Sequence, residues 1–276
     1  ANNVLYVLED SNDDYLYSAE IKSVSEDASK PTRTLAVKLV AEKPSYTNMQ
    51  IVVKVPNVRK PVPLFILMRA LGVESDREII QMCLIDMEAN KGMLELFRPS
   101  VHDAGYIFTQ SSALKYIASF TKRQTTTYAL HLLMDYLLPH MGELNFKSKA
   151  YYLGYMVRKL LFVHMKMEPP TNRDKYSYKR IEVAGNLIYQ LFVEYYNLQT
   201  KFIYSKIDEE YFWHKSDYKN DKFINVVMNK QKLVFGNRVV EEGFRKAFKG
   251  NWGSQPHTKR PGIVQDLNRL SFFSAT

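Results

Sequence analysis

Thr34-Leu-Ala-Val-Lys-Leu-Val40 and Gln50-Ile-Val-Val-Lys-Val55 decide the first part of the fold, because both place apolar side chains with a period of two. This alternation is typical of β-strands that bury one face. Proline and polar residues separate the two stretches, so we expect a hairpin or part of a meander. Residues 4–8 and 15–21 are similar in composition and are expected to add strands.

From Pro61 onward the pattern becomes helical. Residues 64–71 predict a short apolar helix that stops at Gly72. Ser75-Asp-Arg-Glu78 then has the residue types of a capping box at the start of a second helix. Further helices are expected over residues 112–120, 127–138 and 147–165, and the core-facing positions of the last are Tyr152, Met156, Leu160 and Val163.

Two more helices are expected in the C-terminal third. One runs from Ile181 to about Gln199, and the other covers residues 238–248 with Asn237 as its cap and an end near Gly250. The chain is therefore expected to be a helix-rich α+β protein with one small β-sheet. The apolar face of the first of these helices consists of Val183, Leu187, Leu191, Tyr195 and Leu198.

Charge is unevenly distributed along the 276 residues, whose net charge is +9. Residues 1–170 carry 20 Lys/Arg and 18 Asp/Glu, whereas residues 171–276 carry 18 and 11. The balance changes at Glu168-Pro-Pro-Thr-Asn-Arg-Asp174, where two prolines predict a loop, so we place a domain boundary there. A basic C-terminal part is compatible with a polyanionic partner and equally with an ordinary solvated surface.

The ends and the single cysteine set further expectations. The chain starts at Ala1 without an initiator Met and finishes in an apolar, strand-like stretch over residues 270–276, which predicts an internal fragment. No apolar run approaches the roughly 18 residues that a membrane helix needs, so no membrane partner is expected. Cys83 lies in an apolar stretch, which favours a buried structural thiol over a reactive one.

Catalytic and metal-binding motifs are missing from the sequence. It contains no Walker A loop, no G-x-G-x-x-G, no nucleophile elbow and no His-Glu-x-x-His pair. Asp208-Glu-Glu210 is the densest acidic run, but adjacent positions of a helix point in different directions, which favours a solvated face over a metal site. We therefore expect neither catalytic nor metal-binding residues and no cofactor bound by this chain.

Two basic segments stand out instead. Residues 173–180 include Arg173, Lys179 and Arg180, and residues 249–260 combine Lys249, Lys259 and Arg260 with Trp252 and two glycines. Lys and Arg neutralise phosphate, glycine lets a backbone approach a ligand, and a tryptophan ring can stack on a base. A flexible basic loop without any partner has the same composition, so both interpretations stay open here.

The same segments resemble one protein family. Asn172-Arg-Asp174, Lys179-Arg180 and Ala184-Gly185 are similar to the D-R-D-x-x-x-x-K-R-x-x-x-A-G stretch of the second-largest subunit of multisubunit DNA-directed RNA polymerases. The fork region of that family reads G-N-W and then R-x-G-[VI]-x-Q-x-L-N-R. It resembles Gly250-Asn-Trp252, Arg260-Pro-Gly262, Gln265 and Leu267-Asn-Arg269.

Upstream landmarks of the family's lobe occur in the same order, so the resemblance spans about residues 4–276. They are Met68-Arg-Ala-Leu-Gly72, Leu137-Leu-Pro-His140 and Tyr152-Leu-Gly-Tyr-Met156. The resemblance points to the eukaryotic, archaeal or large-DNA-virus branches. It implies a lobe over residues 1–170, a helical return segment to the protrusion over 171–246, and the start of the fork over 247–276.

The resemblance also implies partners and roles. The chain would line the DNA cleft and the RNA–DNA hybrid beside the largest and smaller polymerase subunits, while Mg²⁺ in the complete enzyme is held mainly by the largest subunit. Arg173, Lys179 and Arg180 would line the cleft. Arg269 would either approach nucleic acid or brace the fork through a carboxylate. The residues expected near nucleic acid are Lys249, Trp252, Lys259, Arg260, Gln265, Asn268 and Arg269.

Other functional classes and locations stay open at this point. The alternatives are a freestanding basic nucleic-acid-binding protein and a scaffold module whose basic face meets an acidic protein. The expected location is the nucleus of a cellular eukaryote, or the virion or cytoplasmic viral factory of a large DNA virus.

Overall fold

The structure is a computed structural model that describes residues 2–26, 30–42, 49–216, 218, 223–229 and 231–270. The chain divides into two compact units, Ala1–Arg180 and Ile181–Thr276. No helix among the described residues is both long and apolar enough to span a bilayer.

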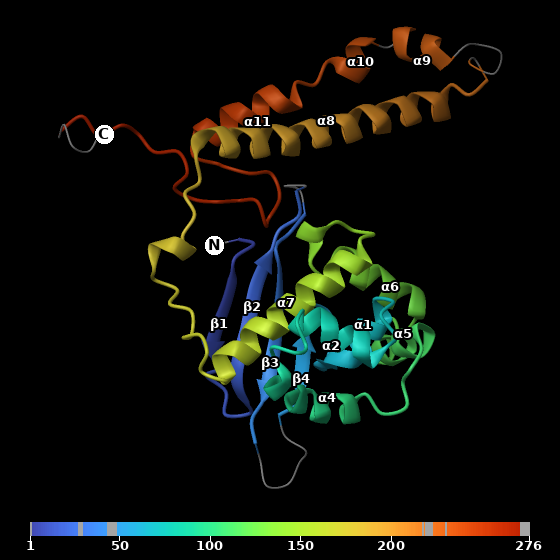
Figure 1. Cartoon of the computed structure of the whole chain (residues 1–276). Coiled ribbons are helices and arrows are strands. Elements are labelled where there is room, and N and C mark those ends of the chain that lie inside the picture. Colours follow the sequence, from blue (N-terminus) through green and yellow to red (C-terminus); the bar gives the residue numbers. More distant parts are fainter. Residues whose placement is uncertain are drawn as a thin grey trace. The chain divides into compact units, whose positions relative to one another are not determined.

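The first unit contains a five-stranded antiparallel sheet whose strands are neighbours in chain order (Figure 1). The predicted meander is confirmed, because residues 36–39 pair directly with residues 51–54. The alternation is visible in the third strand, where Leu35, Val37 and Leu39 are buried. The strands are β1 (Leu5–Glu9), β2 (Tyr15–Ser23), β3 (Arg33–Val40), β4 (Ile51–Lys54) and β5 (Val62–Pro63).

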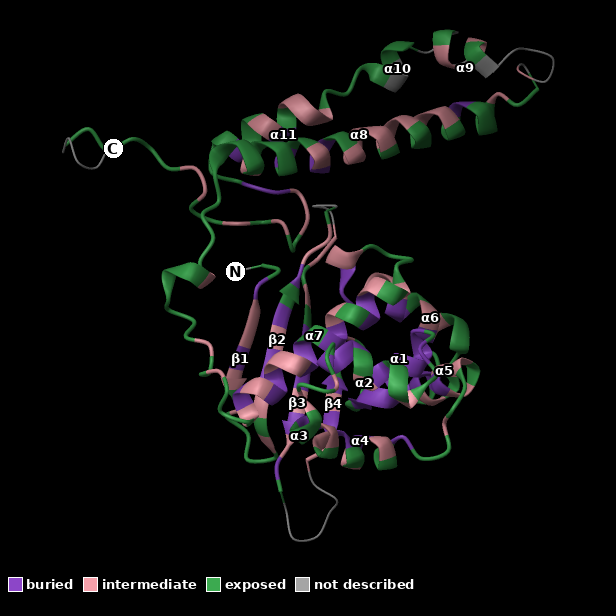
Figure 2. Ribbon diagram, in the orientation of Figure 1, coloured by how far each residue is buried: buried purple, intermediate pink, exposed green. Residues whose placement is uncertain are grey.

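Helices pack against this sheet, and the residues coloured as buried in the helices and strands form the main core (Figure 2). The helix α7 packs on β1, β2 and β3 and also on α2. Met156, Leu160 and Val163 of α7 are buried as predicted, and Tyr152 packs at the edge of the core. The helices are α1 (Leu64–Ala70), α2 (Asp76–Leu84), α3 (Lys91–Leu94), α4 (Arg98–Asp103), α5 (Gln110–Ser119), α6 (Thr126–Asp135) and α7 (Phe146–His164).

Several helix ends differ from the sequence expectation. Ser75 makes no side-chain cap at α2, so the predicted capping box does not form, and the Asp76 carboxylate instead accepts from the buried Arg69 guanidinium. A capping box appears at α5, between Thr109 and Ser112. The helix α6 ends before the predicted residue 138, because Leu138 precedes a proline, which disfavours a helical backbone at that position.

The titratable side chains of Lys149 and Cys83 are buried inside the first unit. The Lys149 ammonium donates to the carbonyls of Leu133 (2.8 Å) and Met134 (2.6 Å) in the last turn of α6, where a helix dipole favours positive charge. Burial lowers the pKa of Lys149 to about 8, although the nearby Asp135 acts in the opposite direction. Burial raises the pKa of the Cys83 thiol, and this side chain is the buried structural thiol that was predicted.

Residues 171–180 pack on the first unit. The Thr171 backbone N–H donates to the Val7 carbonyl (2.7 Å), and the Tyr6 hydroxyl donates to the Tyr178 carbonyl (3.2 Å). The division between the compact units therefore falls after Arg180, later in the chain than the proline loop. The predicted division into lobe, return segment and fork describes functional regions and stays a prediction.

The second unit is built around one long helix, along which three shorter helices return (Figure 1). Its core consists of Leu191, Tyr195, Ala247 and Trp252. Gly243 is required at the crossing of α8 and α11, because a Cβ there would lie 2.4 Å from the Tyr195 ring. The helices are α8 (Ala184–Trp213), α9 (Phe223–Asn229), α10 (Gln231–Phe235) and α11 (Val239–Phe248).

The predicted second-unit helices exist with different limits. The helix α8 starts later and ends later than predicted, and Val183 is exposed ahead of its first turn instead of lying in the core. At α11, Arg238 occupies the cap position expected for Asn237 and makes no side-chain cap. The strand-like stretch expected at the C-terminus lies outside the described residues apart from Leu270.

Candidate nucleic-acid interface

The candidate interface is the segment that follows α11, residues 249–270, which we call the basic loop. Gly250 ends α11 in a left-handed conformation with φ +101°. Its N–H donates to the Ala247 carbonyl (3.0 Å), and the Asn251 N–H donates to the Lys246 carbonyl (3.1 Å). This is the hydrogen-bond pattern of a glycine-terminated helix, and it turns the chain away from the helix axis.

A buried carboxylate on α8 holds the middle of the basic loop. Glu194 is only 5% exposed and accepts from the backbone N–H groups of Ser254 (2.8 Å) and Gln255 (3.2 Å). It also accepts from the hydroxyl of Thr258 (2.7 Å) and from the Ser254 hydroxyl. A buried charge is tolerated when it is hydrogen-bonded in this way. Glu194 therefore fixes the shape of residues 254–258.

Trp252 and Gly253 serve the packing of the loop itself. Trp252 is 8% exposed and fills the second-unit core, so its ring has little surface on which a base could stack, contrary to the sequence expectation. Gly253 has φ +87°, and a Cβ there would lie 2.3 Å from the Thr258 carbonyl oxygen. The close approach that this glycine permits is to the loop's own backbone and not to a ligand.

Arg260 is held by an acidic partner. Its guanidinium donates to both carboxylate oxygens of Glu182, with one of the two distances being 3.1 Å, and its backbone N–H donates to the Trp252 carbonyl (3.3 Å). The ion pair compensates the charge of Arg260. A phosphate could bind the Arg260 guanidinium only by displacing Glu182. We therefore assign Arg260 a structural role, in which it links the loop to Glu182.

Three other cations of the basic loop differ from Arg260, because they have no acidic partner among the described residues. Lys249, Lys259 and Arg269 are exposed, and none of them has an ion pair within the described part of the chain. The carboxylate brace considered for Arg269 is therefore not found there. Gln265 is exposed and donates to the Gly262 carbonyl (3.0 Å), and the Asn268 side chain accepts from the Leu270 N–H (3.0 Å).

The predicted cleft-lining residues lie in the first unit. Arg173 pairs with Glu20 (3.3 Å) and lies over the Tyr6 ring, 5.7 Å from its centroid. Arg180 donates to the carbonyls of Ser177 and Lys179, both at 2.9 Å. The Lys179 side chain is exposed. Of these three cations, Lys179 has the fewest contacts to lose on binding an anion.

Glu194 and Glu182, the acids that hold the basic loop, were not predicted from the sequence. The sequence does contain an indication of a buried role for Glu194. Glu194 interrupts the apolar face formed by Leu191, Tyr195 and Leu198, and a charged residue on a buried helix face requires a buried partner. Glu182 gave no such indication, because it lies in an exposed stretch ahead of α8 and not on a buried helix face.

The described residues do not assemble a metal centre. Across ranges 2–26, 30–42, 49–216, 218, 223–229 and 231–270, no three His, Cys, Asp or Glu side chains converge. Asp208-Glu-Glu210 lies on α8, and Glu210 is buried there while the other two acids are exposed. Asp208-Glu-Glu210 therefore does not form a three-ligand cluster with other described residues.

Comparison with known proteins identifies the class to which this fold and loop belong. The profile of the family described as RNA polymerase Rpb2, domain 2, matches residues 2–182. The chain belongs to this family, that of the second-largest subunit of multisubunit RNA polymerases. The resemblance seen in the sequence motifs is confirmed.

Among individual proteins, the chain is similar to second-largest subunits from eukaryotes and archaea. It is 34% identical to DNA-directed RNA polymerase II subunit RPB2 of Encephalitozoon cuniculi, over 99% of this chain and 23% of that protein. It is 30% identical to DNA-directed RNA polymerase II subunit 2 of Arabidopsis thaliana, over 94% and 22%. It is 32% identical to subunit Rpo2 of Saccharolobus solfataricus, over 80% and 19%. The chain thus spans about a fifth of the length of these relatives.

Proposed function

We propose that this chain is part of the second-largest subunit of a DNA-directed RNA polymerase and contributes to the surface that holds DNA and the RNA–DNA hybrid. The observation that carries the proposal is family membership, together with relatives whose names identify polymerase subunits. Its partners would be the largest and the smaller polymerase subunits. Nucleotidyl transfer, with its Mg²⁺, would take place at residues that this chain does not supply.

The uncommitted cations of the basic loop support a role in holding nucleic acid. Lys249, Lys259 and Arg269 are exposed and unpaired among the described residues, so they are available to neutralise phosphate. Gln265 and Asn268 carry amide groups that can bond phosphate or 2′-hydroxyl oxygens without reading a base. Such contacts suit a polymerase, because it must hold every sequence that it transcribes.

This assignment is favoured over a freestanding nucleic-acid-binding protein or a scaffold module, because neither alternative explains membership of the family. In a cellular eukaryote the proposed location is the nucleus, as expected for a relative of RNA polymerase II subunits. In a large DNA virus it would be the virion or the cytoplasmic viral factory.

Charge reversal at Lys259 in the complete polymerase tests the proposal. Lys259→Glu removes a phosphate contact, so elongation complexes should dissociate about three- to tenfold faster at low salt. The ratio to wild type should shrink as salt rises, since the variant releases fewer counterions on binding. Dissociation is measured by the loss of labelled transcript from immobilised complexes across a salt series.

The matched control is Lys232→Glu, which makes the same charge change at an exposed position of α10 in the same unit. It should dissociate at nearly the wild-type rate. Both variants should copurify with the other subunits. Equal rates for Lys259→Glu and wild type, or equal effects of the two variants, would remove the basic loop from the proposed contact surface.

A further inference from the structure

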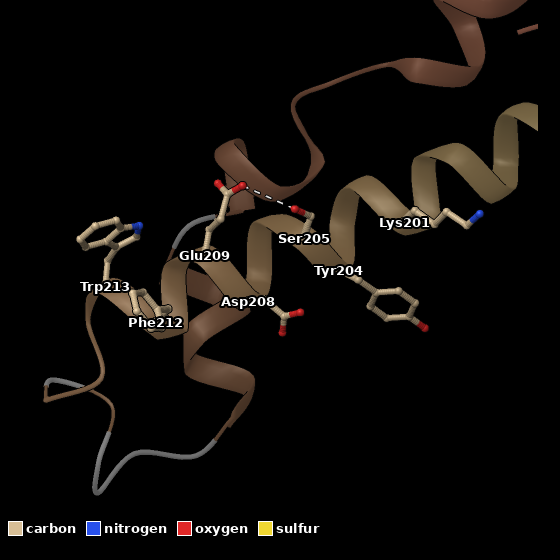
Figure 3. A pocket seen from close by; sticks show the side chains of 7 residues that line it. All are labelled: Lys201, Tyr204, Ser205, Asp208, Glu209, Phe212 and Trp213. Atoms are coloured by element: carbon tan, nitrogen blue, oxygen red, sulfur yellow. Dashed lines mark hydrogen bonds between the residues drawn. The ribbon is translucent and has the colours of Figure 1, made fainter. Parts of the chain in front are cut away.

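The distal half of α8 carries two neighbouring rows of side chains at four-residue intervals. Tyr204, Asp208 and Phe212 form the first row, which we call the α8 stripe. Ser205, Glu209 and Trp213 form the second. Figure 3 shows Tyr204 and Asp208 projecting from one edge of the helix, and Ser205 and Glu209 from the other. Together with Lys201, whose exposed side chain lies at the proximal end, the rows line an open hollow on the surface of this helix.

The aromatic rings of this hollow are exposed to an unusual degree. Tyr204 is 65% exposed, Phe212 is 72% exposed and Trp213 is 77% exposed. Phe212 and Trp213 contact each other edge to face, with centroids 5.5 Å apart. Exposed aromatic side chains gathered in one place mark interaction surfaces, and aromatic residues dominate the binding energy of many protein interfaces.

The two acids of the hollow differ in whether they have hydrogen-bond or ion-pair partners among the described residues. Glu209 accepts from the Lys206 ammonium and from the Ser205 hydroxyl (3.4 Å), and the bond from Lys206 lowers the pKa of Glu209. The Asp208 carboxylate has neither a hydrogen bond nor an ion pair to another described residue. The α8 stripe therefore places an available negative charge between two exposed rings.

We propose that the α8 stripe binds an arginine side chain on a basic segment of a protein partner. A guanidinium pairs with a carboxylate through two parallel hydrogen bonds and also stacks on aromatic faces. Residues four apart on a helix are separated by about 6 Å along the axis, which is also the reach of a cation–π contact. A guanidinium held by Asp208 thus lies within reach of both Tyr204 and Phe212.

This site is distinct from the proposed nucleic-acid surface, because the charge of Asp208 repels phosphate. It is also selective among cations. A lysine ammonium is a more strongly hydrated point charge that cannot make the bidentate pair, so it should bind the stripe more weakly than a guanidinium.

The test measures binding of a fluorescent peptide with three Gly-Arg repeats to the full 276-residue chain by anisotropy at low salt. Two comparison peptides carry lysine or the uncharged analogue citrulline in place of arginine. Asp208→Asn should weaken arginine-peptide binding about three- to tenfold. Tyr204→Leu and Phe212→Leu should each weaken it about two- to fivefold.

Tyr189→Leu is the matched control, since Tyr189 is equally exposed on α8 but lies outside the hollow. It should bind like wild type. The proposal is overturned if the citrulline peptide binds as well as the arginine peptide, or if Asp208→Asn leaves binding unchanged. It is also overturned if the stripe variants weaken binding of single-stranded RNA and leave peptide binding intact.

Discussion

Removing the Glu194 carboxylate should destabilise the second unit, because four donors of the basic loop converge on it. Glu194→Ala removes the acceptor of the Ser254 N–H and hydroxyl, whereas the Gln255 N–H and the Thr258 hydroxyl keep their bonds to the Thr258 hydroxyl oxygen and the Gln255 carbonyl. Hydrogen bonds to a charged group contribute about 1.5–3 kcal/mol each, but water can reach part of this loop. We therefore expect a total loss of about 2–4 kcal/mol, a large share of the about 5–15 kcal/mol that stabilises a domain.

Tryptophan fluorescence can follow this loss selectively. Both tryptophans, Trp213 and Trp252, belong to the second unit, and the first unit has none. In a Trp213→Phe background the buried Trp252 alone reports on this core. With a urea m-value of about 1–3 kcal/mol per molar, Glu194→Ala should lower the unfolding midpoint by about 1 M or more.

Two controls separate the anchoring role from the loss of a charge on the helix. Glu194→Gln keeps one acceptor oxygen and should lose about half as much stability as the alanine variant. Glu209→Ala removes an exposed acid from the same helix and should leave the midpoint unchanged. An unchanged midpoint for Glu194→Ala would show that the loop does not depend on this carboxylate, and the reasoning would fail.

Two further predictions concern the buried residues. Leu191→Asp should cost at least about 3 kcal/mol, because it buries an unpaired charge at a position that is 1% exposed. The exposed control Ile188→Asp should change the Trp252 transition little, and equal effects of the two would contradict the assigned core. Because the pKa of Lys149 is about 8 in the folded state, below its usual 10.5, the unfolded state binds the proton more tightly between these values. The stability of the first unit should therefore rise as pH increases from about 8 to 10 in circular-dichroism melts, and Lys149→Met should remove this rise.

The local pattern of apolar residues in the sequence was sufficient to predict much of the fold. The strands β3 and β4 follow from alternation, and α7 follows from the spacing of Met156, Leu160 and Val163. Both patterns depend only on which face of a regular element is apolar. Helix ends were less predictable. Ser75 does not cap α2, and Asp76 at the start of this helix pairs instead with Arg69 of α1, a contact that depends on how the two helices pack.

The candidate interface was also predictable from the sequence only in part. The motifs from Gly250 to Arg269 identified the family from sequence, and the comparisons confirm it. They did not separate cations that are available to phosphate from those already used. Arg260 and Lys259 are adjacent in the chain, yet only Arg260 is held by an acid, Glu182, which is 78 residues away.

By itself, the sequence determined the family, the helix-rich α+β class and the order of the main elements, because these depend on local periodicity and on motifs that are contiguous in the chain. Only the tertiary structure decided that Trp252 belongs to a core, that Gly253 makes room for the loop's own carbonyl, and that Glu194 organises residues 254–258. The roles of Trp252 and Glu194 depend on distances between segments about 60 residues apart, and that of Gly253 depends on how the same loop folds back on Thr258. Local propensity carries no information about such distances, since they are set by how the helices pack.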